Sequence, residues 1–424
     1  LDELTTRIQH PGQQVLYQGN SPYGRLIVTE SSGQHSFLHN GVVLFSAQHV
    51  MDTEETLSYT DQQVEETVHY AMAQRPDARR VLLISGGVSG TAREVLKYWE
   101  DAHSREDATL DYVELDPQII DVARRYLPGI LDDPRGRIRV FTTDGRRVVS
   151  REAEAGAYDV VIVDVPDPST SQINRFYTRE FFEQVGRRLA ADGVLTMSLG
   201  HYENYLSDEL ANPIAVAHQT LHREFQNVLI LPAGRIYFLA SDGPLTTGVA
   251  ERLQSKGIDN QWMTPRYLDD VLGPLRLNAV RRAVSEEAPV NRDFNPILYY
   301  HHLRYWVSRF KVRMGLLEGG LVALVLVCLL RARPVSFALF TTGLAASALE
   351  IVLLVAFQIL YGYVYHQVGW ILTMFMIGLG IGSLTMNRIL ARRTRRDLAL
   401  LEFAVAGYAV CLPLVLIALG RLEN

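Results

Sequence analysis

The sequence of 424 residues predicts an α/β protein with three parts: a small N-terminal β domain, a doubly wound parallel sheet, and a C-terminal bundle of transmembrane helices. Short apolar runs alternate with helical segments from residue 81 to residue 199, an order typical of doubly wound sheets. These runs are continuously apolar, which suits strands buried on both faces. Beyond residue 312 most of the chain is apolar, and runs of this length indicate membrane-spanning helices.

The N-terminal part reads as about four short strands broken by turn residues. Asn40-Gly41 predicts a hairpin turn, because both residue types accept positive φ. We expect the domains to cover residues 1–60 for the β unit, 61–245 for the doubly wound sheet, 246–312 for an α-rich extension and linker, and 313–424 for the transmembrane helices. The chain begins at Leu1, so we expect it to be part of a longer product.

The doubly wound part is predicted from its apolar runs and from a closing antiparallel hairpin. The runs are Val81–Ser85, Leu110–Glu114, Ile138–Thr142, Tyr158–Asp164 and Gly193–Leu199, and the hairpin comprises Val228–Pro232 and Arg235–Ser241. The apolar stretches of the C-terminal part are 314–330, 337–360, 368–387 and 398–419. Three of them are long enough to cross a bilayer, and the first is marginal in length.

Composition excludes several kinds of site. A net charge of −6 gives no reason to expect nucleic acid as a partner. The two cysteines, Cys328 and Cys411, lie in apolar runs, which excludes a disulfide framework and a cysteine-based zinc site. No His, Asp or Glu cluster has metal-ligand spacing, so we expect no metal.

A glycine turn follows the first strand of the predicted sheet. It reads Ser85-Gly-Gly-Val-Ser-Gly90, and Gly86, Gly87 and Gly90 would let the backbone approach a ligand at a helix N-terminus. A turn of this kind can also serve packing alone. Acidic residues at the ends of the next two strands favour a nucleoside site: Glu114, before Asp116 as the second choice, could bind ribose hydroxyls, and Asp144, followed by Gly145, could accept a bond from an adenine amine.

Two further carboxylates, Asp164 and Asp167, follow the fourth strand in the run Asp-Val-Pro-Asp-Pro. Beside a nucleoside crevice they could bind and deprotonate an amine. Alternatively, Asp164 caps the turn and Asp167 is only a residue before proline.

These elements, taken in order, are similar to the spermidine synthase family of polyamine aminopropyltransferases. The resemblance covers roughly residues 15 to 240 and includes Tyr17-Gln18, Glu65, the glycine turn, Val-Glu-Leu-Asp and Asp-Val-Pro-Asp-Pro. It implies an AdoMet-methyltransferase-like sheet, a homodimer, and aminopropyl transfer from decarboxylated AdoMet to a small amine such as putrescine.

The resemblance also implies roles for single residues. Gln18, Glu114 and Asp144 would contact the nucleoside, and Tyr17 and Glu65 would lie on the substrate side. Asp167 would be the base that deprotonates the attacking amine, and Asp164 would help to bind that amine.

The chain departs from the family's pattern at several of these places. Val88 stands where the family's glycine loop has an acid that would face the cationic aminopropyl arm. The Gly-Pro that normally follows Asp-Pro is replaced by Ser169-Thr170, and only Glu65 remains of the Tyr-His/Gln-Glu motif. Nucleoside binding is therefore better preserved than polyamine binding.

The segments Asp167–Thr178, Asn291–Pro296, Ala346–Glu350 and Met376–Ser383 resemble a branch in which such a domain is fused to transporter-like helices. Arginines between residues 388 and 396 predict a cytoplasmic loop. If the stretch 314–330 also crosses, the nucleoside-binding domain lies outside the cytoplasm, which the sequence favours; if it does not cross, the domain is cytoplasmic. The bilayer is thus the first expected partner.

Three functions remain open at this point. The chain could be a membrane-anchored aminopropyltransferase that uses decarboxylated AdoMet or a related nucleoside. It could be a catalytically degenerate nucleoside-binding or scaffold subunit of a membrane complex. It could also be a transporter with a sensing domain, for which Glu350 in mid-helix is the supporting residue.

Overall fold

The computed structural model of the protein divides the chain into two compact units, Leu1–His302 and Leu303–Asn424, which are described separately. The residues described are 2–49, 56–58, 61–100, 107–202, 206, 208–284, 287–308, 314–331, 333–361, 365–389 and 395–423. The finer domain limits expected from the sequence stay a prediction.

The N-terminal part of the first unit is an antiparallel sheet of five strands in chain order. Its hairpin at Asn40 and Gly41 has φ angles of 51° and 80°, as the sequence predicts. The fifth strand is only three residues long and was not expected. The strands are β1 (Gln14–Asn20), β2 (Arg25–Ser31), β3 (Gln34–His39), β4 (Val42–His49) and β5 (Thr56–Ser58), preceded by helix α1 (Asp2–Gln9).

The larger sheet has seven strands in the order β11-β12-β10-β9-β6-β7-β8. Strands β6 to β10 are parallel, and β12 joins β10 and β11 in antiparallel register. This is the doubly wound, methyltransferase-like sheet that the sequence predicts. The strands are β6 (Arg80–Ile84), β7 (Thr109–Glu114), β8 (Ile138–Thr142), β9 (Tyr158–Val163), β10 (Leu189–His201), β11 (Asn227–Pro232) and β12 (Arg235–Ser241).

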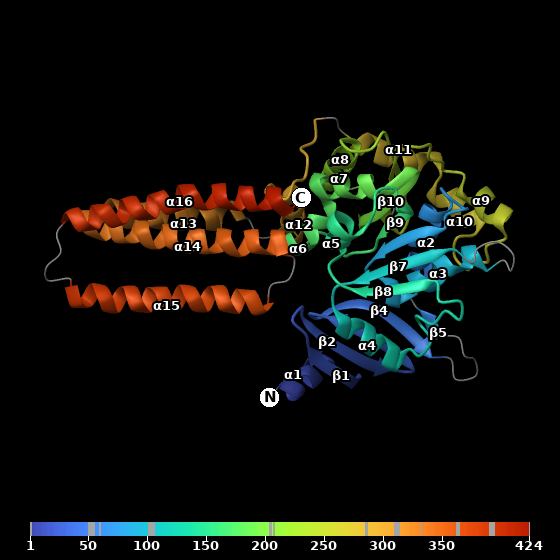
Figure 1. The fold of residues 1–424 in the computed structure, drawn as a ribbon, viewed down its shortest axis with the longest axis horizontal. Helices are drawn as coiled ribbons and strands as arrows, with labels where there is room; N and C mark the ends of the chain where they lie inside the picture. Colours follow the sequence, from blue (N-terminus) through green and yellow to red (C-terminus); the bar gives the residue numbers. More distant parts are fainter. Residues whose placement is uncertain are drawn as a thin grey trace. The chain divides into compact units, whose positions relative to one another are not determined.

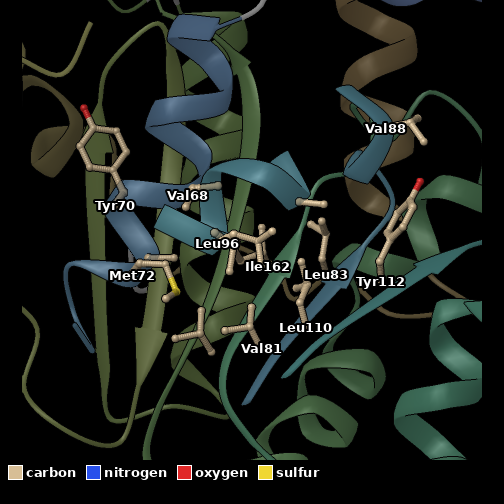
Figure 2. Packing of buried hydrophobic residues seen from close by; sticks show 14 of the residues in the cluster. Val68, Tyr70, Met72, Val81, Leu83, Val88, Leu96, Leu110, Tyr112 and Ile162 are labelled. Carbon is tan, nitrogen blue, oxygen red and sulfur yellow. The ribbon is translucent and has the colours of Figure 1, made fainter. Parts of the chain in front are cut away.

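Strand β6 shows why a continuous apolar run is needed at the centre of this sheet. Val81 and Leu83 join the core on one face, together with residues of helices α2 (Asp61–Met72) and α3 (Thr91–Leu96) (Figure 2). Residues of the N-terminal sheet belong to the same core. Leu82 and Ile84 join a second core on the opposite face. Alternate side chains of an extended strand point to opposite faces, so both sets must be apolar.

The helices and helical turns of the first unit connect the strands and cover the sheet (Figure 1). Those before β10 are α2 (Asp61–Met72), η1 (Gly87–Ser89), α3 (Thr91–Leu96), η2 (Lys97–Trp99), α4 (Pro117–Tyr126), α5 (Gly145–Arg147), η3 (Val148–Glu152), α6 (Ser171–Asn174), η4 (Arg175–Tyr177) and α7 (Arg179–Arg188). Those after β10 are α8 (Asp208–His222), α9 (Val249–Lys256), α10 (Pro265–Val271), α11 (Pro274–Ala283) and α12 (Ile297–Ser308), the last of which runs into the second unit.

The second unit consists of long apolar helices. These are α13 (Met314–Arg331), α14 (Pro334–Tyr361), α15 (Tyr365–Ile389) and α16 (Arg395–Glu423). Among the described residues three segments are long and apolar enough to cross a membrane: Ser336–Phe357, Gly369–Arg388 and Ala399–Leu416. Many of their large apolar side chains are exposed, including Phe403 at 77%. A membrane anchor is therefore suggested, since exposed apolar surface of this extent suits lipid.

Candidate functional site

A cavity of about 680 Å³ opens at the carboxyl ends of β6, β7, β9 and β10, where α/β sheets of this kind bind ligands. Its volume is within the range typical of small-molecule sites. The polar and charged residues that line it are Gln34, Ser46, Gln63, Thr67, Ser85, Ser89, Glu114, Asp164, Asp167, Ser169, Ser198, His201, Arg235 and His302. The rest of the wall is formed by apolar side chains of β4 and by Val64, Gly86, Val88, Ile119, Val165 and Pro166.

The glycine turn forms the floor of this cavity beside Asp164. Ser85 and Gly86 both have positive φ, 63° and 73°, so the chain turns sharply after β6. A Cβ atom on Gly86 would lie 2.0 Å from Asp164 Oδ2, and one on Gly87 would lie 2.6 Å from the ring of Tyr112. The glycines thus allow close approach within the protein, while Gly86 also borders the cavity.

Glu114 lies at the end of β7 and is only 6% exposed. Its Oε2 accepts bonds from the hydroxyl groups of Tyr112 (2.9 Å) and Ser85 (3.3 Å), and its Oε1 accepts from the Leu115 backbone N–H (3.0 Å). Loss of hydration raises the pKa of Glu114 to about 7, against the effect of these three donors. Its place in the cavity wall agrees with the predicted ribose contact, which stays a prediction.

Asp164 follows β9 and faces the same cavity from above the glycine turn. Its Oδ2 accepts a hydrogen bond of 3.1 Å from the Thr91 hydroxyl. Burial raises the pKa of Asp164 above its usual value, and the Thr91 hydroxyl and the Arg235 charge only partly oppose this. A carboxyl group with a raised pKa holds a proton more readily near neutral pH.

Asp167 lines the cavity two residues after Val165 and forms an ion pair with Arg235. Its Oδ1 accepts bonds from the Arg235 guanidinium and from the Gly200 backbone N–H at 2.9 Å. Within the described part of the chain, no hydrogen bond to its other oxygen, Oδ2, is found. One carboxylate oxygen is thus fixed by the protein, and the other is available to a ligand.

Tyr177 supports the loop that carries both carboxylates. Its hydroxyl group is within 3.1 Å of the carbonyl oxygens of Pro166 and Ser198 and donates toward them. The ring is fully buried. The loop between Asp164 and Asp167 is therefore attached to β10 through this hydroxyl group. No motif in the sequence singles out this tyrosine.

Arg235 is the charged residue that sequence reasoning missed. It begins β12 and is 9% exposed. Its Nε donates to Ser198 Oγ at 2.9 Å. Burial lowers the pKa of this guanidinium, but the Asp167 carboxylate, together with Tyr177 and Tyr237, raises it, so that the pKa lies above its usual value. The predicted hairpin could have placed Arg235 near the strand ends, but only the strand register brings it to Asp167.

Asp144 lies outside the lining of this cavity. Its Oδ1 caps the α5 turn by accepting from the Arg146 N–H at 2.8 Å, and its Oδ2 forms an ion pair with Arg175. The next residue, Gly145, is packed so tightly that a Cβ atom would lie 2.6 Å from Ile84 Cγ2. The adenine contact expected of Asp144 stays a prediction, and in this structure its oxygens are bound within the protein.

Glu65 also points away from the cavity. Its carboxylate accepts backbone N–H bonds from Gln261 (2.5 Å), Trp262 (2.8 Å) and Met263 (2.9 Å). It is 3% exposed. The arrangement is that of a carboxylate that fixes a loop, so its expected place on the substrate side has no support from this geometry.

Tyr17 and Gln18 lie on β1, and neither belongs to the cavity wall. The Tyr17 ring lies 6.5 Å from that of Tyr126. Gln18 Oε1 is buried with no hydrogen-bond partner among the described residues. Asp116, the second choice for the ribose contact, instead caps α4 and accepts a bond of 2.6 Å from Ser21.

Val88, in the glycine turn, is buried beside the cavity. Its side chain is 3% exposed and belongs to the buried apolar cluster that includes Tyr112 and Leu83 (Figure 2). The cavity therefore has an apolar wall at this position. Among the described residues no group of three or more His, Cys, Asp and Glu could hold a metal ion.

Comparison with known proteins agrees with this architecture. The family model for the spermine/spermidine synthase domain matches residues 60–231. A polyamine aminopropyltransferase of Pyrobaculum calidifontis is 32% identical over 263 residues, which are 58% of this chain and 84% of that protein. Polyamine aminopropyltransferase 1 of Hyperthermus butylicus is 32% identical over 199 residues, 45% of this chain and 62% of that relative.

A solved structure of spermidine synthase in complex with the transition-state analogue AdoDATO has a TM-score of 0.50 and 23% identity, covering 64% of this chain and 88% of that one. At this identity the likeness concerns the fold. The match to the Pyrobaculum relative covers 84% of that protein. The residues matched by the family model, 60–231, include the glycine turn, the acidic strand ends and the aspartate loop. On this evidence the chain belongs to the spermidine synthase family.

Proposed function

We propose that this protein transfers an aminopropyl group from decarboxylated AdoMet to an amine at the cytoplasmic surface of a membrane. The observation that carries the proposal is that Glu114, Asp164 and Asp167 line one cavity at the carboxyl ends of the strands. The names of the relatives, polyamine aminopropyltransferases, support the reaction type.

The reaction needs few groups from the protein. The amine nitrogen attacks the propyl carbon next to the sulfonium, an N–C bond forms, and the C–S bond breaks. The electron pair of that bond stays on sulfur, so neutral methylthioadenosine leaves, and the amine loses one proton. Asp167 can accept this proton on Oδ2, because its Oδ1 is held by Arg235 and Gly200. Asp164, which lines the same cavity, is the group proposed to help bind the amine.

The placement of the domain on the cytoplasmic side is supported by the number of candidate spans. The arginine-rich connection after α15 favours the cytoplasm. With three crossings, α14 begins on that side, and so does the preceding domain. The helix α13, 18 residues long, is not among the candidate spans found in the described residues. Decarboxylated AdoMet is made in the cytoplasm, so this side suits the reaction. A homodimer stays a prediction from the resemblance.

The first prediction concerns the base. Asp167→Asn should reduce kcat by at least about 100-fold, as expected for loss of general base catalysis, with almost unchanged affinity for methylthioadenosine. Turnover is measured on the detergent-solubilised chain by release of methylthioadenosine, and affinity by calorimetry. Asp77→Asn is the matched control, because Asp77 is largely exposed and pairs with Lys256 on the surface.

Unchanged turnover in Asp167→Asn would remove Asp167 as the base and point to Asp164. If the wild-type protein binds neither decarboxylated AdoMet nor methylthioadenosine, aminopropyl transfer is not its function.

A further inference from the structure

The end of the cavity around Asp164 and Asp167, where the amine would bind, is termed the amine end. Its charges differ from those that a diamine requires. At neutral pH putrescine carries two positive charges, and burying it needs compensating carboxylates. The charged and titratable residues lining this end are Asp164, Asp167, Arg235, His201 and His302, while Glu114 lies at the strand that would hold the nucleoside. One buried guanidinium therefore faces the acceptor together with two carboxylates.

Arg235 compensates the negative charge of one of those carboxylates, Asp167. Its guanidinium forms an ion pair with Asp167, and both groups are mostly buried, with side-chain exposures of 11% and 24%. Opposite charges in a direct ion pair neutralise each other strongly when water is largely excluded. An amine at Asp167 therefore meets a carboxylate whose charge is already compensated, and a second ammonium group would lie next to a like charge.

The second carboxylate, Asp164, does not supply the negative charge that a second ammonium group would need. Asp164 is enclosed by the glycine turn and by Thr91, and loss of hydration raises its pKa. Val88 adds an apolar surface. The cavity end holds at most one uncompensated negative charge, which is enough for one ammonium group.

The Arg235 guanidinium retains a donor for a ligand. Nε donates to Ser198 Oγ and Nη2 to Asp167 Oδ1. Among the described residues no hydrogen bond from Nη1 is found. In the strand register His201 lies opposite Arg235, and its side chain lines the same cavity. An anionic group in this position would receive charge-assisted hydrogen bonds from the guanidinium.

We infer that the acceptor is an amine that also carries a carboxylate, which Arg235 binds, and that a diamine is not the preferred acceptor. This inference rests on the proposed function and specifies the substrate class of the same site. Arg235 is then the residue that determines specificity: its positive charge repels a second ammonium group and attracts a carboxylate.

The test compares two probes with the same four-carbon chain, 4-aminobutyrate and putrescine. Each is titrated by calorimetry into the full chain in detergent, saturated with methylthioadenosine. The wild-type protein should bind 4-aminobutyrate about tenfold or more tightly than putrescine, as expected for one hydrogen-bonded charge pair. Arg235→Gln should reverse this order, whereas Arg235→Lys should keep it. Arg139→Gln is the control, since Arg139 pairs with Asp111 outside this cavity and should leave the order unchanged.

The outcomes separate this inference from the proposed function. Tighter binding of putrescine by the wild-type protein, or a preference that Arg235→Gln does not alter, would overturn the assignment of the acceptor. Failure to bind methylthioadenosine would overturn the proposed function, and the inference with it. If decarboxylated AdoMet replaces methylthioadenosine and bound 4-aminobutyrate still causes no release of methylthioadenosine, the reaction is overturned but the ligand class is kept. If Arg235→Gln loses methylthioadenosine binding, the inference is judged from the preference of the wild-type protein and from whether Arg235→Lys keeps it.

Discussion

At the scale of single residues, the site depends on contacts that only certain side chains permit. Gly86 illustrates this, because it combines a φ of 73° with a position where a Cβ atom would lie 2.0 Å from Asp164 Oδ2. A substitution there strains the backbone and displaces one of the two carboxylates of the amine end. The glycine turn thus fixes the position of Asp164 as well as forming the floor of the cavity.

The glycine turn allows a test with a matched control. Gly86→Ala should lower affinity for methylthioadenosine and lower the thermal midpoint, because it adds a clash to the strain of positive φ. Gly33→Ala has a similar φ of 80° but no atom within 4 Å of the added Cβ, so it should cost only the backbone strain of about 1–2 kcal/mol. Equal effects of the two substitutions on both readouts would contradict the role given to the close approach.

Residue roles were only partly predictable from the sequence. Glu114, Asp164 and Asp167 could be placed together, because the carboxyl ends of parallel strands meet at one edge of a sheet. Arg235 could not, because its position depends on the register by which β12 pairs with β10. Asp144 was expected to contact adenine, but its carboxylate forms an ion pair with Arg175. Side-chain packing decides which of these directions a carboxylate takes, and the sequence does not reveal that packing.

At the scale of elements, helix α2 connects the doubly wound sheet to the segment that precedes α10. Glu65 accepts three backbone bonds from residues 261–263. Glu66, next to it, accepts bonds from the hydroxyl of Tyr267 and the amide of Gln62. Burial raises the pKa of Glu66, against the effect of these donors. Two successive acids of one helix thus attach the C-terminal extension to the sheet.

This arrangement predicts a structural effect for Glu65. Glu65→Gln places an amide NH₂ against backbone N–H donors, so it should destabilise the protein by about 1–3 kcal/mol, as expected for an unsatisfied buried bond. Nucleoside affinity and the KM for the acceptor should stay unchanged. The thermal midpoint and steady-state kinetics are measured beside the exposed control Glu100→Gln. A raised KM with an unchanged midpoint would instead support the substrate contact that the resemblance implies.

Helices and strands with a clear apolar pattern were predictable from the sequence, and short ones were not. The central strands and the hairpin of β11 and β12 follow from apolar runs and an Ala-Gly turn. The region 246–312 has no clear periodic pattern in the sequence, because its helices are short and α10 and α11 each begin with proline. Strand β5 has only three residues, too few for a periodic signal.

At the scale of the whole molecule, an α/β domain and a set of apolar helices occur in one chain. The two units are separately compact, Leu1–His302 and Leu303–Asn424. The apolar stretches predicted from the sequence match helices α13 to α16 closely, because long apolar runs leave little choice of structure. Which side the first unit occupies depends on the single short helix α13, since one crossing more or fewer inverts the topology.

The central claim is that the domain performs aminopropyl transfer on the cytoplasmic side of a membrane. It is tested most directly in sealed vesicles that contain the full chain, prepared inside-out and right-side-out. Decarboxylated AdoMet is added outside together with putrescine and 4-aminobutyrate, and methylthioadenosine release is measured. The account predicts release by inside-out vesicles and almost none by right-side-out vesicles until detergent opens them. Release by right-side-out vesicles alone would contradict the cytoplasmic placement, and no release from either, even in detergent, would contradict the transfer reaction.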